Sequence, residues 1–204
     1  MKNLLNSNPK LKKTMLRLVF NPRTARTRLW VRVFIYPFVI KKGKHSKIRS
    51  SVRLDLNPNN KFQIGSGSII ESGAIINNGI GDIVIGDNSM ITCRAMILAP
   101  AIIGNNVVVG ISSQVLGLTH DFNDISLSVK EQSVSGTQVT IKDGAWIGGN
   151  CCILQGVTIG EHSLVGAGSV VNKDVPPYSV AVGNPARVIK RYDFDKKEWV
   201  RVER

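Results

Sequence analysis

The sequence predicts an all-β solenoid, a chain wound into stacked coils of short strands. Three observations support this prediction. Aliphatic residues recur every six positions, the repeat stops once for about twenty residues, and the excess positive charge lies before the repeat begins. A period of six fits neither an amphipathic helix nor a strand with one buried face. It fits short strands joined by turns, each pointing one aliphatic side chain into a shared core.

The repeat is clearest in residues 141–175, where a small or β-branched residue follows each aliphatic position by four. Two earlier runs bring the total to fifteen six-residue units, which make about five coils if three units form one turn. We expect the aliphatic members to point inward: Ile64, Ile70, Ile76, Ile85, Ile91, Ile97, Ile103, Val109, Val115, Ile141, Ile147, Ile153, Ile159, Val165 and Val171.

Residues 1–47 are predicted to form a separate basic segment. Fourteen of the 27 Lys and Arg residues lie in the first fifty positions, and the first acidic residue is Asp55. Residues 3–20 are expected to form a basic amphipathic helix. The twelve-residue apolar run 29–40 is too short to cross a bilayer, which needs about 20 residues. With cations on both sides, this run favours an anchor on an anionic membrane surface. The flanking cations are Arg23, Arg26, Arg28, Lys41, Lys42, Lys44 and Lys47.

Two alternatives for this segment stay open. The apolar run could instead pack on the first coil and cap it, because an open coil end exposes core and unpaired backbone. A basic run can also bind nucleic acid, but the sequence contains no recognisable nucleic-acid module, so a nucleic-acid partner is not expected.

The rest of the chain is predicted as a β-helix over residues 48–182 and a C-terminal part over 183–204. Residues 48–60 read as an irregular first coil or cap. The interruption at 118–138 must leave the stack at a corner, so it should project as a loop. Residues 193–204 are expected to form a short charged helix, with Asp193 or Asp195 as its N-cap.

One histidine is a candidate for chemistry. His45 lies in the lysine cluster and His162 in a turn, so both are expected to be ordinary surface residues. His120 begins the long interruption, where a neutral imidazole could accept a proton from a hydroxyl. Its alternative role is to hold the loop by hydrogen bonding. The three cysteines have no metal-ligand spacing, which favours reduced thiols in a cytoplasmic protein.

Residues 139–189 (VTIKDGAWIGGNCCILQGVTIGEHSLVGAGSVVNKDVPPYSVAVGNPARVI) resemble the C-terminal half of the hexapeptide-repeat acyltransferases. That family includes galactoside and maltose O-acetyltransferases and sugar O-acetyltransferases of surface-polysaccharide pathways. The resemblance implies a left-handed parallel β-helix and a homotrimer with active sites between subunits. It also implies acetyl-CoA as the acetyl donor, no metal, and His120 as the general base.

The same resemblance implies a coenzyme A groove along the C-terminal coils. Its residues would be Trp146, Gly149, Ala167, Asn172, Lys173, Arg187 and Lys190. Two of them depart from the family pattern. Asn172 replaces a threonine, and Lys190 replaces a common arginine, which keeps the charge but loses the bidentate fork. Asn77 and Asn78 lie near the positions at which the galactoside-type members carry acidic residues, so we expect these two asparagines to bind the acceptor.

These features together predict an O-acetyltransferase that modifies a sugar hydroxyl of a surface polysaccharide or its lipid-linked precursor. We expect it in the cytoplasm, at the inner face of the cell membrane. One alternative is an N-acetyltransferase of a nucleotide-linked amino sugar, and another is a non-enzymatic solenoid that binds membrane or nucleic acid. A γ-type carbonic anhydrase is not expected, because His45, His120 and His162 are badly spaced for one metal site.

Overall fold

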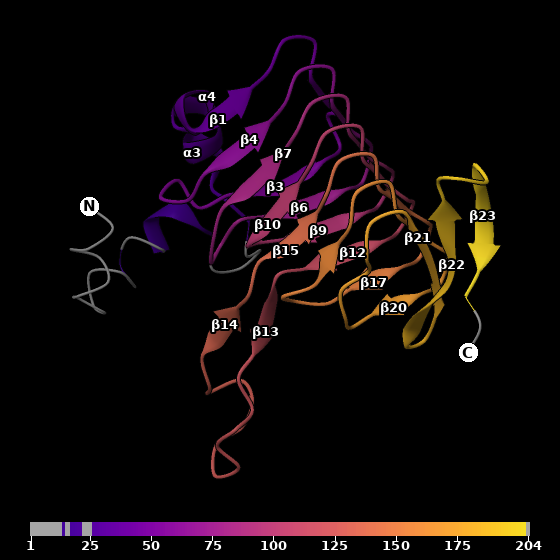
Figure 1. The fold of residues 1–204 in the computed structure, drawn as a ribbon. Coiled ribbons are helices and arrows are strands. Elements are labelled where there is room, and N and C mark those ends of the chain that lie inside the picture. The colour runs from indigo at the N-terminus through magenta and orange to yellow at the C-terminus, as the bar shows by residue number, and fades with distance from the viewer. Residues whose placement is uncertain (1–13, 15–16, 22–25, 203–204) are drawn as a thin grey trace.

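The computed structural model describes residues 14, 17–21 and 26–202, so most of the helix expected over 3–20 lies outside the described residues. Within them the chain forms an all-β solenoid of six stacked coils with three strands each (Figure 1). The first three coils are β1 (Ile40–Lys42), β2 (Lys47–Ile48), β3 (Arg53–Asp55); β4 (Phe62–Ile64), β5 (Ile69–Ile70), β6 (Ile75–Asn77); and β7 (Ile83–Ile85), β8 (Met90–Ile91), β9 (Met96–Leu98). The next three are β10 (Ala101–Ile103), β11 (Val108–Val109), β12 (Gln114–Leu116); β15 (Val139–Ile141), β16 (Trp146–Ile147), β17 (Cys152–Ile153); and β18 (Thr158–Ile159), β19 (Leu164–Val165), β20 (Val170–Val171).

Each coil contributes one strand to each of three sheets, and strands of successive coils pair in parallel. One sheet has the order β1-β4-β7-β10-β15-β18, and a second contains β3, β6, β9, β12, β17 and β20. The third, here called the nine-stranded sheet, contains β2, β5, β8, β11, β16 and β19 and continues into three C-terminal strands. This architecture is consistent with the left-handed parallel β-helix expected from the family resemblance.

The core confirms the six-residue repeat. All fifteen predicted aliphatic positions are at most 1% exposed. Buried serines occupy several corners of the coils, and Ser113 illustrates how their hydroxyl groups find hydrogen-bond partners. Its Oγ donates to the Gly148 carbonyl at 2.6 Å and accepts the Cys151 N–H at 3.0 Å. Paired hydroxyls of this kind avoid the penalty of a buried unsatisfied polar group.

The solenoid begins earlier than the sequence predicted. Ile40 of β1 pairs with Phe62 of β4, so the first coil starts eight residues before the expected boundary at 48, and the five regular coils that the repeat predicted follow it. The repeat is hidden here because Lys42 occupies the position that pairs with the buried Ile64 of the next coil. Lys41, Lys42 and Lys47 are all exposed.

Two short helices, α3 (Leu29–Phe34) and α4 (Tyr36–Val39), precede the first coil and pack against it. Val31 and Tyr36 are their buried residues. The Tyr36 hydroxyl accepts the Leu56 N–H at 3.0 Å and lies 2.7 Å from Thr27 Oγ1, to which it donates. Among the described residues, every helix is too short or too polar to cross a bilayer.

The interrupted repeat projects as an arm, as predicted. β13 (Leu118–His120) and β14 (Val134–Gly136) pair antiparallel and carry the chain away from the stack between β12 and β15 (Figure 1).

The prediction of a C-terminal helix over residues 193–204 is wrong, because strands occupy this part of the chain. β21 (Ser179–Gly183), β22 (Ala186–Asp193) and β23 (Glu198–Arg201) extend the nine-stranded sheet, with β22 and β23 antiparallel. Asp193 does use its side chain as a cap, since Oδ1 accepts the N–H groups of Asp195 and Lys196, but what it caps is the β22–β23 turn. Edge-to-face contacts of Tyr192 with Phe194 and Trp199 favour the hairpin over a helix.

Candidate active site

Trp146 and Lys190 lie in one lateral row of the nine-stranded sheet. Trp146 pairs with Leu164, Leu164 with Val180, and Val180 with Lys190. Residues directly opposite one another on neighbouring strands point to the same face. Because Ile147 beside Trp146 is buried and Trp146 is 53% exposed, this row lies on the outer face.

Gly149 and Ala167 lie at the corner that follows this row. The Gly149 carbonyl accepts the Gly168 N–H at 2.9 Å, so the two turns stack directly. A Cβ added to the neighbouring Gly148 would lie 2.6 Å from the Ala167 nitrogen. The corner is therefore narrow and almost free of side chains, which suits close approach of a thin ligand to the backbone.

Arg187 belongs to the same edge of the solenoid. It pairs with Val182 in the β21–β22 ladder, and the Gly183 N–H donates to Ser169 Oγ at that corner. The structure thus brings together five predicted coenzyme A residues, here called the Trp146 edge: Trp146, Gly149, Ala167, Arg187 and Lys190.

Asn172 and Lys173 do not join the Trp146 edge within one chain. Both are exposed and follow β20, so they lie where β12, β17 and β20 end, whereas Gly149 and Ala167 lie where β17 and β20 begin. The parallel order of these strands separates the two groups by the width of one sheet.

His120 lies on the same side as Asn172 and Lys173. It is exposed at the end of β13, which follows β12 directly, and it pairs with Val134 of the arm. Figure 1 shows the arm and the β21–β22–β23 hairpin leaving different sides of the solenoid. In a single chain, His120 therefore stands across the β12–β17–β20 sheet from the Trp146 edge.

Asp121 holds the arm together beside His120. Hydrogen bonds from the Ser133 and Ser135 hydroxyls lower the pKa of the Asp121 carboxyl below its ordinary value, and the nearby His120 adds a smaller effect. Each carboxylate oxygen accepts one of these serine bonds. Asp121 thereby fixes the root of the arm on which His120 is mounted.

Asn78 is not available for an acceptor, which corrects the expectation from the sequence. Its side chain is fully buried, Oδ1 accepts the Asn57 N–H at 2.6 Å, and Nδ2 donates to the Asn60 carbonyl at 3.1 Å. Asn78 thus holds the turn between the first two coils. Asn77 is half-buried and its Oδ1 accepts the Gly79 N–H, which leaves its amide nitrogen as the group that an acceptor could use.

Cysteine thiols and metal-ligating side chains are the other groups that could carry chemistry. Cys93, Cys151 and Cys152 are free, and burial raises the pKa of the Cys152 thiol. Within the part of the chain that the structure describes, no three His, Cys, Asp or Glu residues converge as metal ligands.

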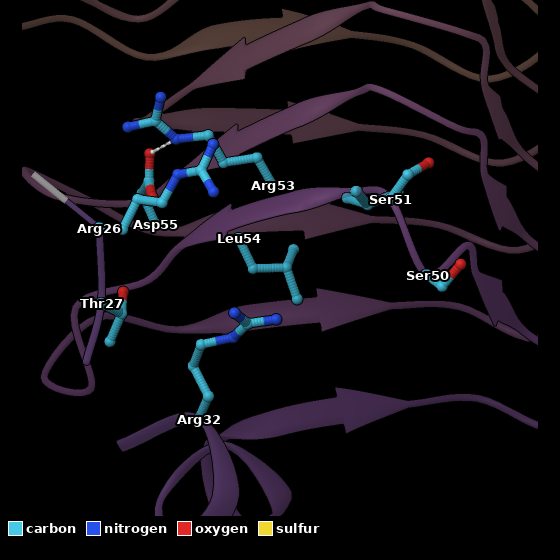
Figure 2. A pocket seen from close by; sticks show the side chains of 9 residues that line it. Arg26, Thr27, Arg32, Ser50, Ser51, Arg53, Leu54 and Asp55 are labelled. Carbon is cyan, nitrogen blue, oxygen red and sulfur yellow. Dashed lines mark ion pairs between the residues drawn. The ribbon is translucent and has the colours of Figure 1, made fainter. Parts of the chain in front are cut away.

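One pocket was missed by the sequence analysis. It lies between the residues before α3, α3 itself and the first coil, and three arginines and Asp55 line it (Figure 2). The available signal was that the first acidic residue of the chain, Asp55, is two positions from Arg53 within a segment otherwise rich in cations.

Comparison with known proteins agrees with the fold. Residues 138–173 match the family described as bacterial transferase hexapeptide (six repeats). The chain is 34% identical to a hexapeptide-repeat acetyltransferase from Vibrio cholerae O1 biovar eltor, solved in complex with acetyl-CoA. That match covers 61% of this chain and 70% of the other, with a TM-score of 0.54.

Two further proteins are similar. A mutant N-acyltransferase from Bacillus cereus, solved with dTDP and coenzyme A, is 25% identical over 78% of this chain and 76% of its own, with a TM-score of 0.53. A Schizosaccharomyces pombe protein named as a candidate acetyltransferase is 39% identical over 102 residues, which are 50% of this chain and 48% of that protein. This chain therefore spans about half the length of that curated relative.

The repeat, the coil architecture and these similarities define a hexapeptide-repeat protein of the transferase type. The chain belongs to the hexapeptide-repeat acyltransferase family.

Proposed function

We propose that this protein transfers an acetyl group from acetyl-CoA to a sugar hydroxyl, in a surface polysaccharide or its lipid-linked precursor. The observation that carries the proposal is the Trp146 edge. An exposed indole, a corner without bulky side chains and two cations, Arg187 and Lys190, follow one another along it. A pantetheine arm needs a narrow, largely apolar path, and the phosphates of coenzyme A need cations at its end. The similarity to the Vibrio cholerae enzyme solved with acetyl-CoA supports this donor.

His120 is the proposed general base. It takes the proton from the acceptor hydroxyl as the oxygen attacks the acetyl carbonyl, and coenzyme A leaves as its thiol after protonation. General base catalysis by a positioned imidazole contributes about 10²–10⁴-fold in rate. This direct transfer requires no serine or cysteine nucleophile, and its acceptor would be oriented in part by the Asn77 amide.

We further propose a homotrimer whose three active sites lie between subunits. In a single chain, His120 lies at the end of the strands of one sheet and the Trp146 edge lies at their beginning. One chain therefore cannot present both to the same acetyl group. A neighbouring copy can supply the missing half. Asn172 and Lys173, which share the His120 side, would then meet the coenzyme from the second subunit.

The helices before the first coil support a peripheral membrane location for this enzyme. Leu29, Phe34 and Phe38 are 73%, 67% and 86% exposed, and the exposed cations Arg28, Lys41 and Lys42 flank them. Apolar side chains with cations around them suit the interface of an anionic membrane. A lipid-linked acceptor at the inner face of the cell membrane would be within reach there.

A second candidate is N-acetylation of a nucleotide-linked amino sugar. The similarity to the Bacillus cereus N-acyltransferase solved with dTDP and coenzyme A favours it. The donor and its edge would be the same, and an amine would replace the hydroxyl as the attacking group.

Calorimetric titration of the purified protein with acetyl-CoA tests the proposal. Saturable binding is expected, and release of free coenzyme A thiol with sugar acceptors rather than amino-sugar nucleotides would assign O-transfer. Absence of acetyl-CoA binding would instead favour a non-enzymatic solenoid that works through its basic N-terminal segment.

Sedimentation with anionic vesicles tests the membrane contact, which Phe34→Ser combined with Phe38→Ser should weaken. Unchanged sedimentation of that double variant would contradict the membrane proposal.

A further inference from the structure

A small pocket at the first coil gathers three arginines from three different elements. Arg26 comes from the segment before α3, Arg32 from α3 and Arg53 from β3, and Figure 2 shows their side chains around one space. We call this space the Arg32 pocket. Its volume is about 220 Å³, which at roughly 30 Å³ per water molecule corresponds to about seven waters. That is enough for a phosphate group and several further atoms.

The pocket carries a net positive charge. Among the described residues that line it, three guanidinium groups face one carboxylate, Asp55, so their formal balance is three minus one, or +2. Ser50 and Ser51 add hydroxyl groups to the wall. Planar guanidinium groups match the oxygens of phosphate in a fork geometry, and this combination with hydroxyl donors is typical of sites for phosphate rather than for a metal ion.

Asp55 gives the pocket a second, independent feature. Asp55 is 4% exposed, and Arg53 Nε lies 2.6 Å from its Oδ2 as an ion pair. The other oxygen, Oδ1, is buried with no hydrogen-bond donor among the residues that the structure describes. Burial raises the pKa of Asp55, while the nearby Arg53, Arg26 and Arg32 oppose that change. A buried carboxylate oxygen without a donor is costly, so a ligand that brings a donor would relieve the penalty.

We infer that the Arg32 pocket binds a phosphorylated ligand. The arginines hold the phosphate, and Asp55 Oδ1 accepts a hydrogen bond from a hydroxyl or ammonium group that the ligand carries next to it. The pocket lies in the first coil, at the other end of the solenoid from β21, β22 and β23, so this binding is separate from the proposed acetyl-CoA groove. The phosphate could belong to a free small molecule or to a lipid headgroup, because both offer the same chemistry.

Titration of the full chain with glycerol 3-phosphate tests the inference, since this probe has a phosphate with neighbouring hydroxyls. Arg32→Gln should weaken binding about tenfold or more, because it removes a charge-assisted contact. Arg94→Gln is the matched control, an exposed arginine at a corner of the third coil outside the pocket. Asp55→Asn should tighten binding of inorganic phosphate, because it removes the one negative charge of the pocket. A folding defect cannot produce that gain.

Sedimentation with phosphatidylcholine vesicles, with and without phosphatidic acid, identifies the source of the phosphate. A lipid ligand predicts that phosphatidic acid promotes sedimentation, that glycerol 3-phosphate competes, and that Arg32→Gln abolishes the effect. A soluble ligand predicts glycerol 3-phosphate binding that depends on Arg32, with equal vesicle binding by wild type and variant. The inference is overturned if neither probe shows binding that depends on Arg32, or if Arg94→Gln weakens binding as much as Arg32→Gln does.

Discussion

Trp146 and Lys190 occupy the same row of one sheet, three strands apart, with Leu164 and Val180 between them. Neighbouring strands are about 4.8 Å apart, so the two Cα atoms are separated by roughly 14 Å. Trp146 belongs to a regular coil, whereas Lys190 is supplied by the antiparallel strand added after the last coil. The C-terminal strands therefore close the coil stack and also complete the surface on which we place the coenzyme.

Replacement of Trp146 or Lys190 should weaken acetyl-CoA binding. Trp146→Ala removes the exposed apolar surface, and Lys190→Gln removes a cation, so each should raise the dissociation constant about tenfold, the second more strongly at low salt. Calorimetric titration measures both effects. Trp30→Ala, which changes an exposed tryptophan on α3 at the other end of the solenoid, is the matched control. Equal affinities of all three variants and wild type would remove the groove from this edge.

Loss of the His120 imidazole should abolish turnover without loss of the donor. We expect His120→Ala to lower kcat by about 10²–10⁴-fold while acetyl-CoA affinity stays near that of wild type. His162→Ala, at an exposed histidine that stacks on Tyr178, should keep normal turnover. Substantial residual activity in His120→Ala would show that another group acts as the base.

Mixed oligomers should recover activity that both variants lack when acetyl-CoA is kept well below the dissociation constant of the Trp146→Ala variant. When His120→Ala and Trp146→Ala chains are co-expressed, some interfaces pair an intact His120 with an intact Trp146 edge, provided that the site lies between subunits. The measurement is thiol release by oligomers purified with a different tag on each variant. If each site were built within one chain, the mixture at this acetyl-CoA concentration would show no more activity than its separate components.

The arm should loosen in acid. The serine hydroxyls lower the pKa values of Asp121, Asp124 and Glu131 in the folded chain. A carboxyl whose pKa is depressed on folding stabilises the structure above its unfolded pKa, and this stabilisation is lost as the pH falls through the folded value. Relative to the intrinsic exchange rate at each pH, hydrogen-exchange protection of residues 121–135 should therefore fall below the ordinary range of these carboxyls, while the coils stay protected. Asp121→Asn should show fast exchange at neutral pH as well, and an arm equally protected at both pH values would contradict this account.

Removal of the Tyr36 hydroxyl should destabilise the junction of α4 with the first coil. Tyr36→Phe leaves the buried Leu56 N–H without its acceptor and Thr27 without its donor, which costs about 1–3 kcal/mol in the free energy of unfolding. Denaturant unfolding measures this change. Tyr178→Phe, whose hydroxyl bonds to Glu161 at the surface, should change stability by much less. Similar losses in both variants would mean that burial is not the cause.

The regular coils could be predicted because their physics is local and periodic. Each inward position must be aliphatic to fill a narrow core, so fifteen buried positions follow from spacing alone. The first coil lacked this signal, since Lys42 stands in the row of the buried Ile64 and Ile40 belongs to an apolar run that continues from α3. Asp193 gave a helix-start signal that a β-turn uses equally well, because both place a side-chain oxygen over free N–H groups.

Site residues were harder to predict because their roles depend on how distant segments meet. The sequence does not indicate that the Asn78 side-chain amide is hydrogen-bonded to the backbone of Asn57 and Asn60. Nor does it indicate that His120 and Trp146 lie at opposite ends of the strands of one sheet, since that arrangement follows from the parallel stacking of β12, β17 and β20. The Arg32 pocket is assembled from residues before α3, on α3 and on β3, so no single spacing marks it.

The coil repeat also fixes the distance between the two ends of the molecule. From Ile83 to Ala101, paired one coil apart, the chain advances by 101 − 83 = 18 residues, and each coil adds about 4.8 Å along the axis. Insertion or deletion of one such unit between the first and fifth coils would move the Arg32 pocket relative to Trp146 in a single fixed step, with both surfaces intact. The distance between the Arg32 pocket and the Trp146 edge can therefore change in evolution by the addition or loss of whole coils, without substitutions in either site.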